Sequence, residues 1–260
     1  MNRRRLSALA PLLVAAVALP QSEHLQGSRV EGDVTVFAAA SLTDSFTEIA
    51  AEFEAVHPDA EVVLNFAASS QLATQIDEGA PADVYASADH HNMERLVDAA
   101  RTDGVPATFA TNELAIIVEP DNPLGIGGLA DLDDPDLIVV MCDPAVPIGA
   151  YTQQLFEAAR VDMTPDSLEE DVRGIVGKVV AGEADAGVVY VTDISAAGDN
   201  AEGVAIPDDV NVVASYPIVA TAEAPNPDGA AAFVQFVLGD QGQAILADIG
   251  FGPPDAATDG

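Results

Sequence analysis

The stretch VTVFAAASLTDSF, residues 34–46, decides the fold because a buried β pattern runs directly into a helical one. The apolar run at 34–38 is typical of a strand, and 42–54 repeats apolar residues at helical spacing. The same order recurs downstream, with strand patterns at 61–66 and 84–88 and helical patterns at 71–77 and 91–99. Strands and helices in rotation predict parallel βαβ units with right-handed crossovers, so the class is α/β.

A second α/β group follows the first. Its strand patterns lie at 113–119, 137–142, 186–191 and 210–219, and its helical patterns at 149–160, 171–181, 228–238 and 241–249. We expect two lobes joined by two crossing strands, near 113–119 and 215–220. Lobe 1 is predicted to comprise residues 32–112 with 218–260, and lobe 2 residues 113–217. Ligands of such sheets bind outside the carboxyl ends of strands, so the expected site is a cleft between lobes.

The N-terminus has the pattern of an export signal. Residues 2–5 (NRRR) are basic, residues 6–19 are apolar, and Ala16-Val17-Ala18 offers a small-x-small cleavage site. Fourteen apolar residues are too few to span a bilayer, which needs about 20. We therefore predict that residues 1–31 are a signal peptide and flexible leader, and that the protein works in the periplasm or at the extracellular face of the membrane.

The charge balance narrows the classes of partner. The 260 residues include 43 Asp and Glu against 9 Lys and Arg, a formal net charge of −34. Such a chain repels nucleic-acid backbones and anionic lipid surfaces. With 49% hydrophobic residues it can bury a core, and its one cysteine, Cys142, cannot form an internal disulfide. These features predict a globular protein that binds no nucleic acid.

Hydrogen-bond donors gather at the predicted strand ends. Ser41 and Ser69 each stand just before a helical pattern, where serine commonly caps a helix while its own proton stays free. Gly149 opens another helix and permits close approach of the backbone, a further helix starts near Asp171, and Tyr190 ends a strand. Each residue taken singly fits an ordinary capping or packing role. Together they predict an anion site built from neutral dipoles.

Five stretches of the sequence carry the most specific motifs: VTVFAAASLTDSF (34–46), NFAASSQLATQIDEGAPADVYASAD (65–89), DPAVPIGAY (143–151), EEDVRG (169–174) and AGVVYVTD (186–193). Together they resemble the periplasmic molybdate-binding protein family of ABC importers. The similarity is ordered and runs from about residue 32 to 252. It implies a two-lobed type II periplasmic-binding fold that closes on molybdate or tungstate.

The resemblance also implies which residues bind the oxyanion. The family's two serines fall on Ser41 and Ser69, each donating through hydroxyl and backbone N–H. Backbone donors fall on Ile148 and Val172, and the tyrosine hydroxyl on Tyr190. Ile148 replaces a small residue common in the family, Ala68 stands where a further serine is often seen, and no lipid-attachment cysteine is present. The implied partners are a permease and a separate ATPase subunit; no cofactor or catalysis is expected, and the receptor is expected to be a monomer.

Two other functions stay open at this point. The same fold could serve another tetrahedral oxyanion such as sulfate, and Ser41 or Ser69 could be the nucleophile of a hydrolase. No G-x-S-x-G motif surrounds either serine, which disfavours the hydrolase. The pair His90-His91 could contribute to a metal site, although adjacent helical residues point in different directions. Residues 174–178 lack the spacing of a phosphate-binding loop, so transport energy must come from a partner.

Overall fold

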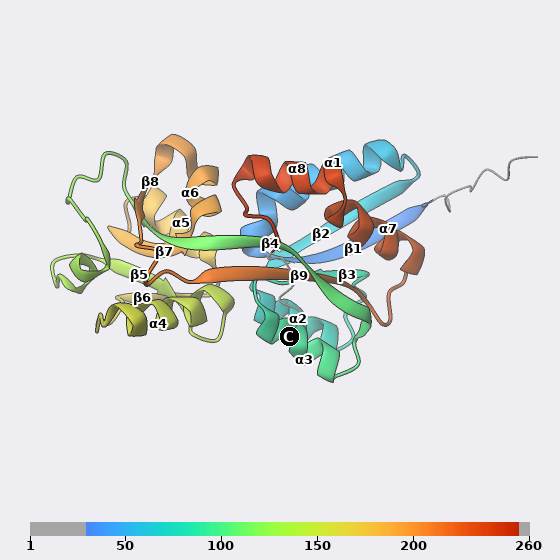
Figure 1. The fold of residues 1–260 in the computed structure, drawn as a ribbon, viewed down its shortest axis with the longest axis horizontal. Coiled ribbons are helices and arrows are strands. Elements are labelled where there is room, and N and C mark those ends of the chain that lie inside the picture. The colour runs from blue at the N-terminus through green and yellow to red at the C-terminus, as the bar shows by residue number, and fades with distance from the viewer. Residues whose placement is uncertain (1–29, 255–260) are drawn as a thin grey trace, which may run out of the picture.

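The computed structural model describes residues 30–254, which form two α/β bodies side by side (Figure 1). The predicted signal peptide and most of the predicted leader lie outside the described residues. Val30 is already buried in the hydrophobic core, two residues before the first strand. Within residues 30–254, no helix has the length and apolar character needed to cross a membrane.

The first body confirms the predicted parallel βαβ units. Strand β1 pairs in parallel with β2 on one side and with β3 on the other, and helices follow each strand. The elements are β1 (Gly32–Ala39), η1 (Ala40–Leu42), α1 (Thr43–Val56), β2 (Ala60–Ala67), α2 (Ser69–Asp77), β3 (Val84–Ala86), α3 (His90–Asp98), α7 (Pro227–Leu238) and α8 (Asp240–Ile249).

The second body repeats this design around β5, which pairs in parallel with β6 and β7. Its elements are η2 (Leu129–Asp133), β5 (Val139–Cys142), α4 (Pro147–Ala159), β6 (Ser167–Glu169), α5 (Val172–Val180), β7 (Ala186–Tyr190), α6 (Val191–Ala197), η3 (Gly198–Asn200) and β8 (Glu202–Ala205). The sequence patterns did not indicate β6, β8 or α6. β6 and β8 are only three and four residues long, and α6 begins directly at the end of β7 with no loop between them.

Two long antiparallel strands connect the bodies (Figure 1). They are β4 (Thr102–Val118) and β9 (Val213–Thr221). β4 pairs with β9 up to Glu113 and takes β7 as a neighbour from Leu114 onward. The described strands thus form one nine-stranded sheet in the order β2-β1-β3-β9-β4-β7-β5-β6, with β8 beside β4.

β4 starts eleven residues earlier than the pattern at 113–119 suggested. Its first half contains Gly104 and Pro106, which indicate turns rather than strands in a sequence. Register shifts in the β4–β9 pairing fall in this region, between Asp103 and Ala107 and between Thr108 and Ala110. The irregularities accommodate the turn-forming residues, so a strand persists where local propensity alone argues against one.

Candidate ligand-binding site

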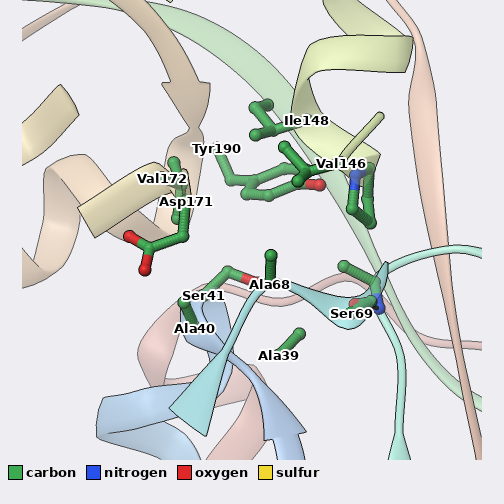
Figure 2. A pocket seen from close by; sticks show the side chains of 12 residues that line it. Ala39, Ala40, Ser41, Ala68, Ser69, Val146, Ile148, Asp171, Val172 and Tyr190 are labelled. Atoms are coloured by element: carbon green, nitrogen blue, oxygen red, sulfur yellow. Dashed lines mark hydrogen bonds between the residues drawn. The ribbon is translucent and has the colours of Figure 1, made fainter. Parts of the chain in front are cut away.

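A small cavity lies between the two bodies and brings together all five residues singled out by the sequence. Ser41 and Ser69 come from the first body, and Ile148, Val172 and Tyr190 from the second (Figure 2). The other lining residues are Ala39, Ala40, Ala68, Ala88, Val146, Pro147 and Asp171. The cavity volume is about 20 Å³, far below the roughly 300–1,000 Å³ of sites for drug-sized ligands. One water molecule needs about 10–15 Å³ on the same measure, so the cavity in this structure is closed to drug-sized ligands.

The two serines do not act as helix caps, which corrects the sequence-based interpretation. The Ser41 hydroxyl lies 3.1 Å from the Tyr216 hydroxyl, and the Ser69 hydroxyl accepts the backbone N–H of Ala88 at 3.0 Å. No side-chain cap occupies the starts of η1 and α2. The first N–H groups of a helix have no partner within it, so both helix starts keep donors available beside the serines.

Two helix starts approach the cavity from the second body. Ile148 is the second residue of α4, which has no side-chain cap, and Val172 is the first residue of α5. Asp171 caps α5 by accepting the N–H of Gly174. That cap lies two positions beyond Val172, so the N–H of Val172 remains without an intrahelical partner. Both residues are buried.

Tyr190 supplies the unusual feature of the cavity. Its side chain is 1% exposed, and its hydroxyl is the one buried side-chain polar atom in residues 30–254 that has no hydrogen-bond partner. An unpaired buried hydroxyl costs about 1–3 kcal/mol. Burial raises the pKa of Tyr190 well above its usual range, so the phenol keeps its proton. The hydroxyl is therefore a donor that faces the cavity without an acceptor.

The cavity contains no basic side chain among its lining residues. The acidic lining residue, Asp171, turns its carboxylate away from Tyr190 and Ser69 (Figure 2). Arg173 forms an ion pair with Asp44, at the start of α1 in the other body. The sequence gives no sign of this contact, because the two residues are 129 positions apart.

Gly149 serves packing and not ligand approach, which is a second correction. A Cβ atom at this position would lie 2.1 Å from the backbone oxygen of Asp143. The start of α4 therefore packs directly on the backbone that follows β5. This contact fixes where Ile148 stands.

We expect Gly149→Ala to lower the free energy of unfolding by about 1–3 kcal/mol, because the backbone must move to make room. Gly177→Ala is the matched control on α5, where an added Cβ meets nothing within 4 Å. That variant should gain about 0.5–1 kcal/mol from helix propensity. Urea unfolding of both variants measures the contrast, and equal effects would show that α4 is free to shift.

The arrangement lacks the parts of a hydrolase or metal site. A serine nucleophile needs a base within hydrogen-bond reach, but the partners of Ser41 and Ser69 are a tyrosine hydroxyl and a backbone N–H. His90 lies 3.4 Å from the Thr108 hydroxyl. In the described part of the chain no three His, Cys, Asp or Glu residues stand close enough to hold a metal ion.

Comparison with known proteins agrees with this geometry. Residues 34–252 match the family described as bacterial extracellular solute-binding protein. This chain belongs to that family. The solute-binding protein is 40% identical to the molybdate-binding protein ModA of Mycobacterium tuberculosis strain H37Rv, over 88% of this chain and 87% of the relative. ModA of Escherichia coli K12 is 34% identical over 85% and 89%. The resemblance to molybdate-binding proteins is thus confirmed.

Solved structures confirm the two-lobed fold of this solute-binding protein. The periplasmic molybdate-binding protein of Azotobacter vinelandii has a TM-score of 0.73 at 21% identity, covering 85% of this chain and 99% of its own. The sulfate-binding protein SubI of Mycobacterium tuberculosis has a TM-score of 0.77 at 20% identity, covering 87% and 88%. At this identity the likeness concerns the fold alone.

Proposed function

We propose that this protein captures molybdate or tungstate between its lobes and delivers it to an ABC permease driven by a separate ATPase subunit. The observation that carries the proposal is the unpartnered, buried Tyr190 hydroxyl, facing a cavity lined by two serines and several helix starts. An oxyanion would accept from these donors: the hydroxyl and N–H of Ser41 and Ser69, the N–H of Ile148 and Val172, and the Tyr190 hydroxyl. The named function of the ModA relatives points the same way.

Neutral donors suffice to bind a dianion. Seven hydrogen bonds to a charged group, at about 1.5–3 kcal/mol each, contribute roughly 10–20 kcal/mol. Association costs about 4–15 kcal/mol, and micromolar affinity needs about 8 kcal/mol net. The repulsion between the surface carboxylates of this acidic chain and a bound anion is screened by salt, because the Debye length is about 8 Å at physiological ionic strength. The net free energy needed for micromolar to nanomolar affinity, about 8–12 kcal/mol, lies within the range that these contributions span.

Calorimetric titration with molybdate, tungstate, sulfate and phosphate tests the proposal. Molybdate and tungstate are expected to bind tightly, and phosphate weakly, since its proton needs an acceptor and the proposed contacts include no carboxylate to accept it. Sulfate carries the same charge but is smaller, so cavity size must discriminate against it. Absence of heat from the first two oxyanions would overturn the proposal, and tight sulfate binding in their place would favour a sulfate receptor.

We also infer that the protein is not an enzyme. Its relatives are named as binding proteins, and neither cavity serine contacts a base. Serine-reactive phosphonates should therefore leave both serines unlabelled. Labelling of Ser41 or Ser69 would contradict this inference and favour the hydrolase hypothesis.

The lobes themselves are part of the proposal. We place the boundaries between lobe 1 and lobe 2 near residues 113 and 217. At the first, β4 changes its pairing partner from β9 to β7, and at the second, β9 crosses between the bodies. An exported, monomeric receptor is consistent with this design and with the extracellular family. Hinge motion across β4 and β9 would open the cavity for ligand entry.

The ion pair between Arg173 and Asp44 should hold the closed form together, because it joins α5 to α1 across the cleft. Both side chains are partly exposed, so the pair is worth about 0–1 kcal/mol. We expect Arg173→Gln to weaken molybdate binding by up to about 5-fold at low salt, mainly through faster release. Arg95→Gln is the matched control, because Arg95 pairs with Asp77 inside lobe 1. Equal effects of the two variants would contradict a role in closure.

A further inference from the structure

Tyr151 makes a hydrogen bond across the cleft, outside the set of residues that line the cavity. It belongs to α4 in the second body and is partly buried against the core. Its hydroxyl donates to the backbone oxygen of Ala88 at 3.3 Å, and Ala88 lies between β3 and α3 in the first body. The direction of this bond is fixed, because a carbonyl oxygen can only accept. Burial raises the pKa of Tyr151, so the phenol keeps the proton that it donates.

Ala88 connects Tyr151 with the candidate site. Its backbone N–H donates to the Ser69 hydroxyl at 3.0 Å, and Ala88 itself lines the cavity. The direction of this bond is fixed as well, because a backbone N–H can only donate. The Ser69 hydroxyl accepts from Ala88 and retains its own proton to donate to a ligand. Tyr151 thus contacts the residue that holds Ser69, and it does so from the opposite body.

Tyr151 stands between the small cavity and a larger groove. The groove has a volume of about 580 Å³, lies between α3 and α4, and is lined in part by Tyr151 and by the exposed pair His90-His91. Val146 and Pro147 line both the groove and the cavity. The bond across the cleft therefore joins the two bodies along the wall that separates the cavity from the groove.

This bond and the ion pair between Arg173 and Asp44 join the bodies on opposite sides of the cavity. Val172, the neighbour of Arg173, lies on one side of the cavity in Figure 2, and Ser69, which Ala88 holds, lies on the other. Separation of the bodies would break both contacts. A bound ligand can leave only after that separation, because the cavity of the structure is so small.

Loss of the Tyr151 hydroxyl would be costly in the closed form alone. Ala88 is 3% exposed, so its oxygen would be buried there without this donor, and a buried polar group that loses its partner is destabilising. When the bodies separate, water can replace the hydroxyl. The bond therefore stabilises the closed form relative to the open form.

We propose that Tyr151 is a positioning residue that stabilises the closed form through Ala88, keeps Ser69 in place against the ligand and slows release of the oxyanion. This inference rests on the proposed function. Tyr151 does not line the cavity, so its effect reaches the ligand through Ala88 and Ser69.

Release of radiolabelled molybdate into an excess of unlabelled molybdate tests the inference. We expect release from Tyr151→Phe to be about 10-fold faster than from the wild type, the size of one buried acceptor that loses its donor. Phenylalanine keeps the ring that packs against the core, so the variant should fold. Tungstate release should accelerate by the same factor, because Tyr151 lies outside the cavity lining. Unchanged release would overturn the proposal, even if the variant were less stable to urea, and unequal factors would indicate contact with the ligand instead.

Thr152→Val is the matched control. Thr152 is the next residue of α4, and its hydroxyl donates to the Ile148 oxygen at 2.7 Å within the same helix. Separation of the bodies leaves that bond intact, so this variant should release molybdate at the wild-type rate. Equal acceleration in both variants would mean that α4 is disturbed as a whole and would overturn the role of the Tyr151 hydroxyl. A wild-type protein that binds neither molybdate nor tungstate would refute the proposed function itself.

Discussion

Replacing Tyr190 by phenylalanine should weaken molybdate binding by about 10- to 150-fold and at the same time stabilise the ligand-free protein. The loss of affinity reflects one hydrogen bond to a charged ligand, about 1.5–3 kcal/mol. The gain in stability arises because the hydroxyl has no partner in the ligand-free structure, and removing an unsatisfied buried group relieves its desolvation cost, about 1–3 kcal/mol. Calorimetry and thermal unfolding without ligand measure the two effects.

Tyr85→Phe is the matched control for this prediction. Tyr85 is also fully buried, but its hydroxyl donates to the backbone oxygen of Ser69 at 2.9 Å. Its loss should lower the unfolding temperature, opposite to Tyr190→Phe. If Tyr190→Phe lowered stability and left the dissociation constant unchanged, the phenol would be structural and the proposed site would lose its main support.

Much of the fold could be predicted from periodicity, because the longer buried strands and helices each have a pattern of their own. Strand β1 with the following helix α1, and helix α5 with the following strand β7, were predicted directly from such patterns. Only the second half of β4 could be predicted from the sequence. Gly104 and Pro106 disfavour a strand in its first half, which is maintained by pairing with β9. Tertiary hydrogen bonding decided the outcome there, and no local signal reports it.

The candidate site was predictable to the level of which residues meet, but not how they are held. Ser41 and Ser69 were expected to cap their own helices, yet their oxygens bond to Tyr216 and to the N–H of Ala88. Tyr216 stands 175 residues after Ser41 inside an ordinary strand pattern. Local patterns place helix starts at a sheet edge, whereas contacts between distant segments decide the direction of each hydroxyl.

Asp193 should make the protein less stable as the pH rises from about 4 to about 7. Its carboxyl is buried in the first turn of α6 and accepts the N–H of Tyr190 at 3.1 Å. Burial raises the pKa of Asp193 from 3.8 to about 7, although Arg173 acts in the opposite direction. Between these values the folded protein holds a proton that the unfolded chain has released, so folding is favoured at the acidic end and loses this contribution as the pH rises. At 1.36 kcal/mol per pKa unit, the loss is up to roughly 4 kcal/mol.

Asp193→Asn separates this effect from the general repulsion in so acidic a chain. The amide keeps an oxygen for the N–H of Tyr190 but does not titrate. The free energy of unfolding of the variant should equal that of the wild type near pH 4. Near pH 8 it should be higher than that of the wild type by up to roughly 4 kcal/mol. Asp199→Asn, at an exposed position six residues away, removes the same charge and should change stability little at either pH. Urea unfolding across this range decides the matter. Parallel profiles for the wild type and Asp193→Asn would mean that the carboxylate is solvated in the folded protein, so that the start of α6 is more open to water than its packing indicates.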